Sequence, residues 1–271
     1  MKVAISGANG FVAKHLKQEF QEFVEIKRND SEEDIVKKLE GVDAVFNLAG
    51  APIIKRWNDN YKKLLYSSRI NSTSKLVAAI NRSKVKHFIS ASAIGAYPDG
   101  EPCDEECEKR AQDYLAYLTQ KWEAEALKCI KPTSIIRFGV ILGKDGGALQ
   151  SMLLPFKLGL GGVIGDGKMM ISWIDVDDMV SMCKFILEKG ATGIFNAVSP
   201  HPVSNRTYTK ALGKTLNRPT IFPLPVFVLK MIFGEGSTVL TASKEIYPKR
   251  ILDLGFDFKY KTINQSLQHL L

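Results

Sequence analysis

The chain has 271 residues, 45% hydrophobic and 24% charged, values typical of a globular protein long enough for one large α/β domain. Its 37 basic and 29 acidic residues give a net charge of +8 without a run of like charges, which argues against a nucleic-acid partner. Four cysteines are too few for a disulfide scaffold, and the longest apolar stretch, 221–233, holds two prolines and is too short to cross a membrane.

The first twenty residues combine a short apolar strand, a glycine-containing turn and an amphipathic helix. The strand at 3–5 leads into Ser6-Gly-Ala-Asn-Gly10, after which a helix pattern begins. Glycine permits backbone angles and a close approach that a side chain would block, so N–H groups at the helix start can face a phosphate. An ordinary glycine-rich turn between a strand and a helix is the alternative. We predict a dinucleotide-binding turn with contacts from Gly7, Asn9, Gly10, Phe11 and Val12.

The second predicted strand, 23–26, ends at a pair of basic residues, Lys27 and Arg28. In dinucleotide-binding folds this strand end meets the adenosine ribose, where an acid binds the 2′-hydroxyl of NAD and a basic residue accommodates the 2′-phosphate of NADP. The pair therefore predicts NADP, with NAD less favoured. Two ordinary surface residues are the alternative, and nearby Asp30 would favour NAD if the strand ended slightly later.

The next segments alternate between helix and strand. Ser31 and the acids after it predict a helix start, and Gly41 predicts its end. A strand from residue 42 then closes on Asn47-Leu-Ala-Gly50, where small residues at a carboxyl end let a ligand lie across the strand. We therefore add Leu48, Ala49 and Gly50 to the predicted cofactor contacts. A polar loop and helix start over 51–69 and a helix over 70–82 are expected to follow.

The middle of the chain contains the residues with the clearest chemical potential. A strand over 85–90 continues through Ser92, and an acidic loop covers 98–112. Asp113 is expected to cap a helix on which Tyr117 and Lys121 lie one turn apart and face the same way. Beyond this helix the pattern predicts a strand over 133–142 and helices over 152–160 and 208–216, with a strand at 193–198 between the last two.

This alternation predicts an α/β fold, a Rossmann doubly wound parallel sheet with a smaller, mostly helical C-terminal substrate lobe. We place the NADP-binding domain at 1–150, with 172–200 returning to the sheet. The substrate-binding lobe is expected to comprise 151–171 and 201–271. No metal is predicted: Cys103 and Cys107 have no partner ligands nearby, and the four histidines are scattered.

Several motifs recur together in one superfamily. They are Ser6-Gly-Ala-Asn-Gly10-Phe-Val-Ala13, Asn47-Leu-Ala-Gly50, Ile89-Ser-Ala-Ser92, Tyr117-xxx-Lys121, and Gly165-Asp-Gly167 followed by Val176-Asp-Asp178. With them the chain resembles the extended short-chain dehydrogenase/reductase superfamily. It more closely resembles the atypical branch of epimerase family, sugar-nucleotide epimerase-like proteins. The motifs responsible are Asn47-Leu-Ala-Gly-Ala-Pro52, Arg56-Trp57, Ser68-Arg69-Ile70, Leu154-Pro-Phe-Lys-Leu-Gly-Leu-Gly-Gly162, Ser172-Trp-Ile174 and Pro248-Lys-Arg250.

The resemblance implies an NAD(P) cofactor and a catalytic set of three residues. Tyr117 would be the general acid/base, Lys121 would lower its pKa and hold the nicotinamide ribose, and Ser92 would hydrogen-bond the substrate oxygen. A phenol titrates near pH 10 and needs an adjacent cation to act near neutrality, which agrees with this assignment. The close branch often lacks the tyrosine, so a structural helix tyrosine is the alternative.

A second departure concerns the substrate. Ile171 stands where sugar-nucleotide enzymes commonly carry an arginine that clamps the pyrophosphate, which argues against an ordinary nucleotide-sugar substrate. Trp173 then either forms an aromatic wall of the site or lies in the core. Asp177 and Asp178 are expected to serve a helix start.

Taken together, the sequence predicts a cytoplasmic NADP-dependent oxidoreductase or epimerase-like enzyme, monomeric or homodimeric. It would act by hydride transfer on a small carbonyl or hydroxyl compound, possibly derived from a sugar. The alternative is a non-catalytic NADP-binding sensor or regulatory protein.

Overall fold

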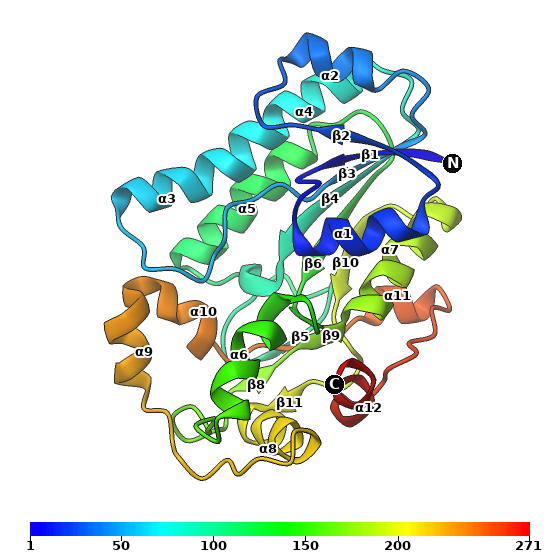
Figure 1. Cartoon of the computed structure of the whole chain (residues 1–271). Helices are drawn as coiled ribbons and strands as arrows, with labels where there is room; N and C mark the ends of the chain where they lie inside the picture. Colours follow the sequence, from blue (N-terminus) through cyan, green and yellow to red (C-terminus); the bar gives the residue numbers. More distant parts are fainter.

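A six-stranded parallel sheet organises the computed structural model, which describes residues 1–271 (Figure 1). Its strand order is β10-β6-β4-β3-β1-β2, so the order reverses between β1 and β3. Open α/β sheets bind ligands outside the carboxyl ends of the strands at such a reversal. The strands are β1 (Lys2–Ser6), β2 (Glu22–Ile26), β3 (Ala44–Asn47), β4 (His87–Ala93), β6 (Thr133–Phe138) and β10 (Gly193–Ala197).

Helices cover both faces of this sheet, as the sequence predicted. Helices α1 (Phe11–Glu19) and α7 (Val176–Lys189) pack on one face, and α2 (Glu32–Lys38), α4 (Ser72–Asn81) and α5 (Tyr114–Ala126) pack on the other. Val3 and Ile5 of β1 belong to the first layer, whereas Ala4 belongs to the second. Burial on both faces explains why β1 reads as a continuous apolar run rather than an alternating one.

Two helix starts agree with the sequence. The Ser31 side chain accepts a hydrogen bond from the Asp34 N–H, and the Asp34 carboxylate accepts one from the Ser31 N–H, forming a capping box. Asp113 caps α5 by accepting from the Ala116 N–H at 2.8 Å.

Residues 51–69, predicted as a polar loop and helix start, become helical well before the helix predicted at 70–82. Helix α3 (Asp59–Tyr66) begins there, capped by Asn58, and runs through a π-helical turn, η1 (Ser67–Asn71), directly into α4. With eight residues, α3 completes little more than two turns, too few repeats of its apolar pattern for the helix to be recognised from the sequence.

The predicted strand at 133–142 is broken in two at Gly139. A Cβ at Gly139 would lie 2.5 Å from the Ser172 carbonyl oxygen. This close approach turns the chain out of the main sheet, so β7 (Val140–Gly143) pairs instead with β9 (Trp173–Asp175). The next helix, α6 (Gly147–Lys157), begins five residues earlier than the predicted start at 152 and ends three before the predicted end at 160.

A smaller part of the molecule lies outside the sheet and the helices that cover it. Figure 1 shows α6, α8, α9 and α10 grouped beneath the sheet. None of the helices combines the length and apolar character that crossing a bilayer requires. The remaining elements are β5 (Pro102–Cys103), β8 (Met170–Ile171), β11 (Val203–Ser204), β12 (Glu245–Ile246), α8 (Asn205–Thr215), α9 (Val226–Phe233), α10 (Thr238–Thr241), α11 (Lys249–Asp253), α12 (Ile263–Leu270), and the short η2 (Ile94–Ala96) and η3 (Gly234–Ser237).

Candidate functional site

The turn between β1 and α1 has the tight geometry that its glycines predicted. Gly7 has a φ of 78°, and its carbonyl accepts a 2.9 Å hydrogen bond from the Gly10 N–H. A Cβ at Gly7 would lie 2.8 Å from the backbone of Leu48 and Ala49. Only glycine therefore lets this turn lie against the end of β3 while the N-terminus of α1 stays open to an anion.

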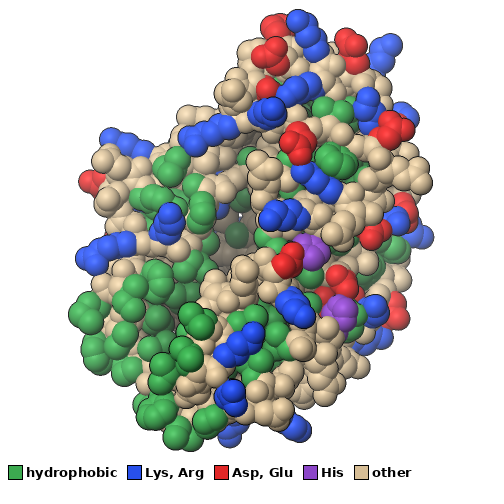
Figure 2. Space-filling model, in the orientation of Figure 1, with side chains coloured by type: hydrophobic (Ala, Val, Ile, Leu, Met, Phe, Trp, Pro, Cys, Tyr) green, Lys and Arg blue, Asp and Glu red, His purple; other side chains and the backbone are tan.

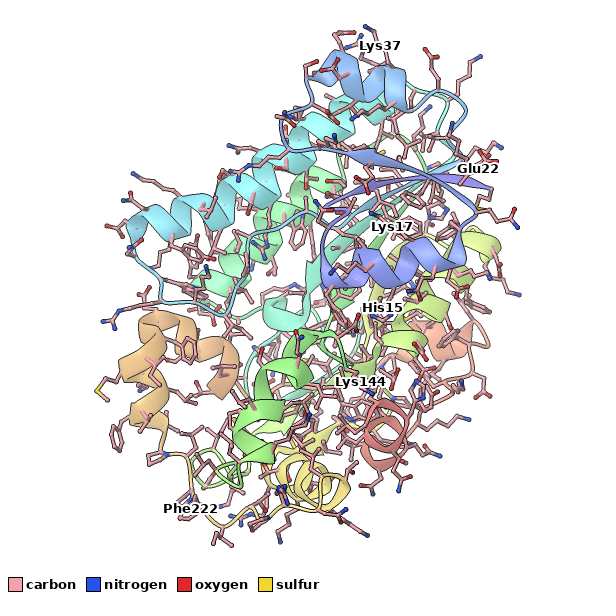
Figure 3. All side chains as sticks on the ribbon, viewed as in Figure 1. His15, Lys17, Glu22, Lys37, Lys144 and Phe222 are labelled. Atoms are coloured by element: carbon pink, nitrogen blue, oxygen red, sulfur yellow. The ribbon has the colours of Figure 1, made fainter.

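A cavity of about 550 Å³, which we call the dinucleotide cavity, begins at this turn. Eight of the ten predicted cofactor residues line it: Gly7, Asn9, Gly10, Lys27, Arg28, Leu48, Ala49 and Gly50. The other two do not. Val12 lines a neighbouring cavity, and the Phe11 ring packs where a Cβ of Gly143 or Gly146 would lie. Figure 3 labels two residues near this region, His15 of α1 and Lys144. The His15 Nε2 lies 3.0 Å from the Asp145 carboxylate.

Basic side chains gather at the far end of the dinucleotide cavity. Lys27 and Arg28 are exposed and line it together with Lys75 of α4, whose ammonium donates to the Arg28 carbonyl at 3.2 Å. Asp30, which left the cofactor preference open, accepts from the Lys27 N–H at 2.7 Å and from the Lys38 ammonium. Its carboxylate is therefore engaged by protein groups and does not line the cavity.

The α3–α4 segment also contributes to this cavity, which the sequence did not predict. Leu64, Ser68, Ser72, Lys75 and Leu76 line it from that side. These residues recur at intervals of three and four, the spacing of one helix face. They could have been predicted from the sequence if the helix had been recognised before residue 70.

A second cavity, of about 230 Å³, adjoins the first, and we call it the inner cavity. Leu48 and Gly50 line both cavities. Figure 2 shows that the molecular face is hollowed between α1 and the α3 and α5 helices. The inner cavity is lined by Val12, Leu48, Gly50, Ile53, Arg69, Ala91, Ser92, Ala93, Leu115, Leu118, Thr119, Trp122 and Phe138.

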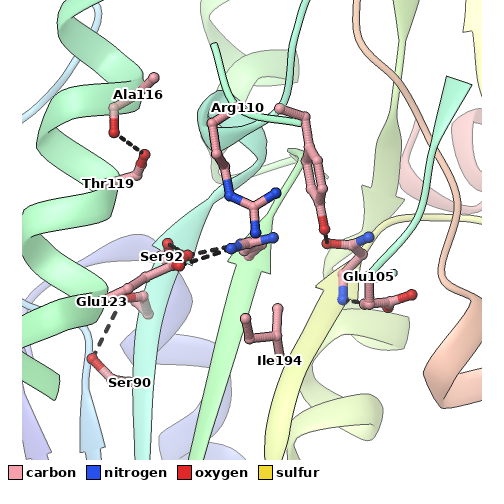
Figure 4. A network of polar contacts seen from close by, with 12 residues as sticks. Ser90, Ser92, Glu105, Arg110, Ala116, Thr119, Glu123 and Ile194 are labelled. Carbon is pink, nitrogen blue, oxygen red and sulfur yellow. Dashed lines mark hydrogen bonds and ion pairs between the residues drawn. The ribbon is translucent and has the colours of Figure 1, made fainter. Parts of the chain in front are cut away.

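Ser92 lines the inner cavity, as a site residue should, but its proton is already engaged. Its hydroxyl donates to the Glu123 carboxylate at 2.5 Å, and Glu123 accepts two further bonds from Arg137, at 2.7 and 2.8 Å (Figure 4). Burial alone would lower the pKa of Arg137, but the ion pair with Glu123 raises it. Toward a ligand the Ser92 oxygen is therefore an acceptor rather than a donor.

Tyr117 and Lys121 do lie side by side, but the structure does not bring them to Ser92. The Lys121 ammonium is 5.8 Å from the centre of the Tyr117 ring, and Tyr117 is 47% exposed. The stripe of α5 that faces the inner cavity carries Leu115, Leu118, Thr119 and Trp122 instead. The i,i+4 spacing does bring the two side chains together, but on the solvent-facing stripe of the helix. The predicted grouping of Tyr117 and Lys121 with Ser92 is therefore corrected.

The acids at the start of α7 have structural partners. Asp175, rather than Asp177 or Asp178, caps the helix, accepting from the Asp177 N–H at 3.0 Å, and burial raises its pKa to about 6. Asp178 accepts from two backbone N–H groups of the segment before α12. Trp173 is fully buried and donates to the His201 carbonyl, so it lies in the core and forms no wall of the site.

Comparison with known proteins places these features in a family. The profile of the NAD dependent epimerase/dehydratase family matches residues 3–197, and a domain of unknown function, DUF1731, matches residues 224–270. The chain is 35% identical over 301 residues to the chloroplastic epimerase family protein SDR39U1 homolog of Arabidopsis thaliana, covering 100% of this chain and 87% of the relative. It is 32% identical over 240 residues to epimerase family protein SDR39U1 of Mus musculus, covering 84% and 82%.

A solved structure of similar architecture is known. The crystal structure of human epimerase family protein SDR39U1 with NADPH superposes with a TM-score of 0.93 at 28% identity, covering 100% of this chain and 99% of that one.

Proposed function

This chain belongs to the NAD dependent epimerase/dehydratase family, and from that premise we propose that it is an NADPH-binding enzyme acting on a small carbonyl or hydroxyl compound. Family membership confirms the resemblance that the motifs predicted, and the fold is the NAD(P)-binding fold of that family. The observation that carries the preference for NADPH is the group of Lys27, Arg28 and Lys75 at one end of the dinucleotide cavity.

The residues of the dinucleotide cavity fit the parts of this cofactor. The Gly7–Gly10 turn and the N-terminus of α1 would hold the diphosphate, because N–H groups and the helix dipole face it there. The basic group would hold the 2′-phosphate. When bound, the nicotinamide supplies a hydride donor or acceptor. The relative with NADPH supports this choice.

The inner cavity is the place we propose for the reacting part of the substrate. It adjoins the dinucleotide cavity across Leu48 and Gly50 and is lined mainly by apolar side chains, which suit an apolar substrate body. Ser92, held in place by Glu123 and Arg137, would position a substrate hydroxyl by accepting a hydrogen bond from it.

Titration of the native protein with NADPH and with NADH tests the proposed cofactor. We expect NADPH to bind at least about tenfold more tightly, because the 2′-phosphate adds charge-assisted hydrogen bonds. Calorimetry gives both dissociation constants, and 2′,5′-ADP against 5′-AMP isolates the phosphate contribution. Equal affinities for the two dinucleotides would contradict the preference.

Tyr117→Phe is expected to change NADPH affinity and hydride transfer by less than about twofold, the ordinary range for an exposed substitution. The reason is its position on the outer stripe of α5, away from both cavities. NADPH absorbance across a panel of carbonyl compounds measures the transfer, and Ser92→Ala serves as the comparison within the inner cavity. Loss of transfer in the tyrosine variant would return the phenol to the mechanism.

A non-catalytic NADPH-binding sensor is the second candidate function. The observation that favours it is the absence of a phenol or ammonium group from the lining of the inner cavity. The same panel separates the two functions: a sensor would bind NADPH and leave it unoxidised with every compound.

A further inference from the structure

One wall of the inner cavity carries a positive charge without a counter-ion. Arg69 donates only to backbone carbonyls, from Nη2 to Ala51 at 3.0 Å and from Nη1 to Leu65 at 3.5 Å. Its Nε makes no hydrogen bond within the protein, and no carboxylate forms an ion pair with the guanidinium. Burial lowers the pKa of Arg69 to about 10, so the group still carries its charge at neutral pH.

Two independent features of the chain make room for this side chain. Arg69 sits in the π-helical turn η1, a departure from regular helix that is often found at functional sites. A Cβ at Gly50 would lie 3.0 Å from the Arg69 Cζ, so glycine at that position leaves space for the guanidinium. The Trp122 ring, 5.3 Å from Cζ, supports the cation from another side.

Arg69 is also the side chain of this cavity with donors to offer a ligand. The lining side chains with an N–H or O–H are Arg69, Ser92, Thr119 and Trp122. The last three already donate within the protein, to a carboxylate of α5, a carbonyl of α5 and a hydroxyl of α4. The other lining side chains are apolar. A matching ligand therefore has an acceptor group facing Arg69 and an apolar body.

We propose that the inner cavity binds a small carboxylate, with Arg69 as the residue that recognises its anionic group. A carboxylate both accepts from the unused N–H groups and supplies the missing negative charge. The proposal rests on the proposed function for its setting beside the dinucleotide cavity. It deepens that function by naming the substrate class: acids that also carry a carbonyl or hydroxyl group.

The size of the cavity limits the substrate further. A cavity of about 150 Å³ accommodates benzene. The inner cavity, at about 230 Å³, accordingly takes an acid of modest size and is too small for a whole nucleotide sugar. If the nicotinamide ring shares this space, the room left for the substrate is smaller still.

Binding of three 2-oxo acids to the NADP⁺-loaded protein tests the proposal. The acids are pyruvate, 4-methyl-2-oxopentanoate and benzoylformate, each compared with its neutral methyl ester by calorimetry. We expect at least one acid to bind about tenfold more tightly than its ester, the value of one charge-assisted hydrogen bond. Arg69→Met should remove that difference, whereas Arg69→Lys should retain part of it. Lys63→Met, at an exposed site on α3, removes the same charge as a matched control.

The outcomes separate this inference from the proposed function. If the native protein binds NADPH but no acid binds better than its ester, the inference is wrong and the proposed function stands. If Arg69→Met weakens NADPH tenfold and leaves acid binding unchanged, the guanidinium serves the cofactor and the inference is equally wrong. If the native protein does not bind NADPH, the proposed function fails, and the same titrations on the unloaded protein still test the pocket. Should Arg69→Met not fold, the Arg69→Lys variant and the acid–ester comparison decide.

Discussion

Replacing Gly7 by alanine is expected to weaken NADPH binding about 100-fold, the value of one or two charge-assisted hydrogen bonds to the diphosphate. The added methyl group would lie 2.8 Å from the backbone of Leu48 and Ala49. Backbone cannot rotate aside as a side chain can, so the turn and the end of β3 must move apart. Both line the dinucleotide cavity, and the N–H groups of the turn would lose their alignment.

Gly41→Ala is the matched control for this variant. Gly41 has a φ of 71°, close to the 78° of Gly7, but a Cβ there meets nothing within 4 Å. Alanine at Gly41 should therefore cost only the left-handed backbone strain, about 1 kcal/mol of stability, and leave NADPH affinity unchanged. Calorimetry and thermal unfolding of the two variants separate loss of the site from loss of folding. An unchanged NADPH affinity in folded Gly7→Ala would show that the turn does not hold the diphosphate.

The parts of the fold that sequence reasoning predicted well are those set by neighbours along the chain. The apolar run of β1 and the caps at Ser31 and Asp113 depend on interactions within a few residues. The break at Gly139 depends on the carbonyl of Ser172, which is distant in sequence, and no local pattern indicates it. The early start of α3 is hard to predict because the helix has only eight residues, in which a periodic pattern repeats too few times to stand out.

The candidate site shows the same difference between features set by neighbours along the chain and features set by distant residues. The glycine turn and the basic pair after β2 follow directly from strand ends, whose position in an α/β sheet is fixed by the fold. The spacing of Tyr117 and Lys121 shows that the two side chains face the same way, but not which way. That direction is set by which stripe of α5 is buried, and the buried stripe carries Leu118 and Trp122. The sequence presents Arg69 only as part of a motif, because its lack of a counter-ion depends on the three-dimensional structure.

Removing both basic residues at the end of β2 is expected to weaken NADPH binding about 100-fold while NADH binding changes by less than about threefold. Each of the two substitutions would remove one charge-assisted interaction with the 2′-phosphate, a group that NADH lacks. Both residues are exposed, so salt screens their contribution, and the affinity for NADPH should fall more steeply with ionic strength than that for NADH. Arg28→Ala alone should weaken NADPH binding about tenfold, because Lys27 and Lys75 still line the cavity.

Titrations of Lys27→Ala/Arg28→Ala with both dinucleotides at low and moderate salt measure this preference. Arg82→Ala is the matched control, since Arg82 is an exposed arginine that pairs with Glu32 and Glu33 outside the cavity. The control should leave the ratio of NADPH to NADH affinity unchanged, which separates a local contact from the general attraction of a basic protein for an anion. Equal losses for both dinucleotides in the double variant would mean that the pair acts on the adenosine or diphosphate they share. Lys75, anchored to the backbone of the same loop, would then be left as the 2′-phosphate ligand, and its replacement by methionine would have to produce the selective loss instead.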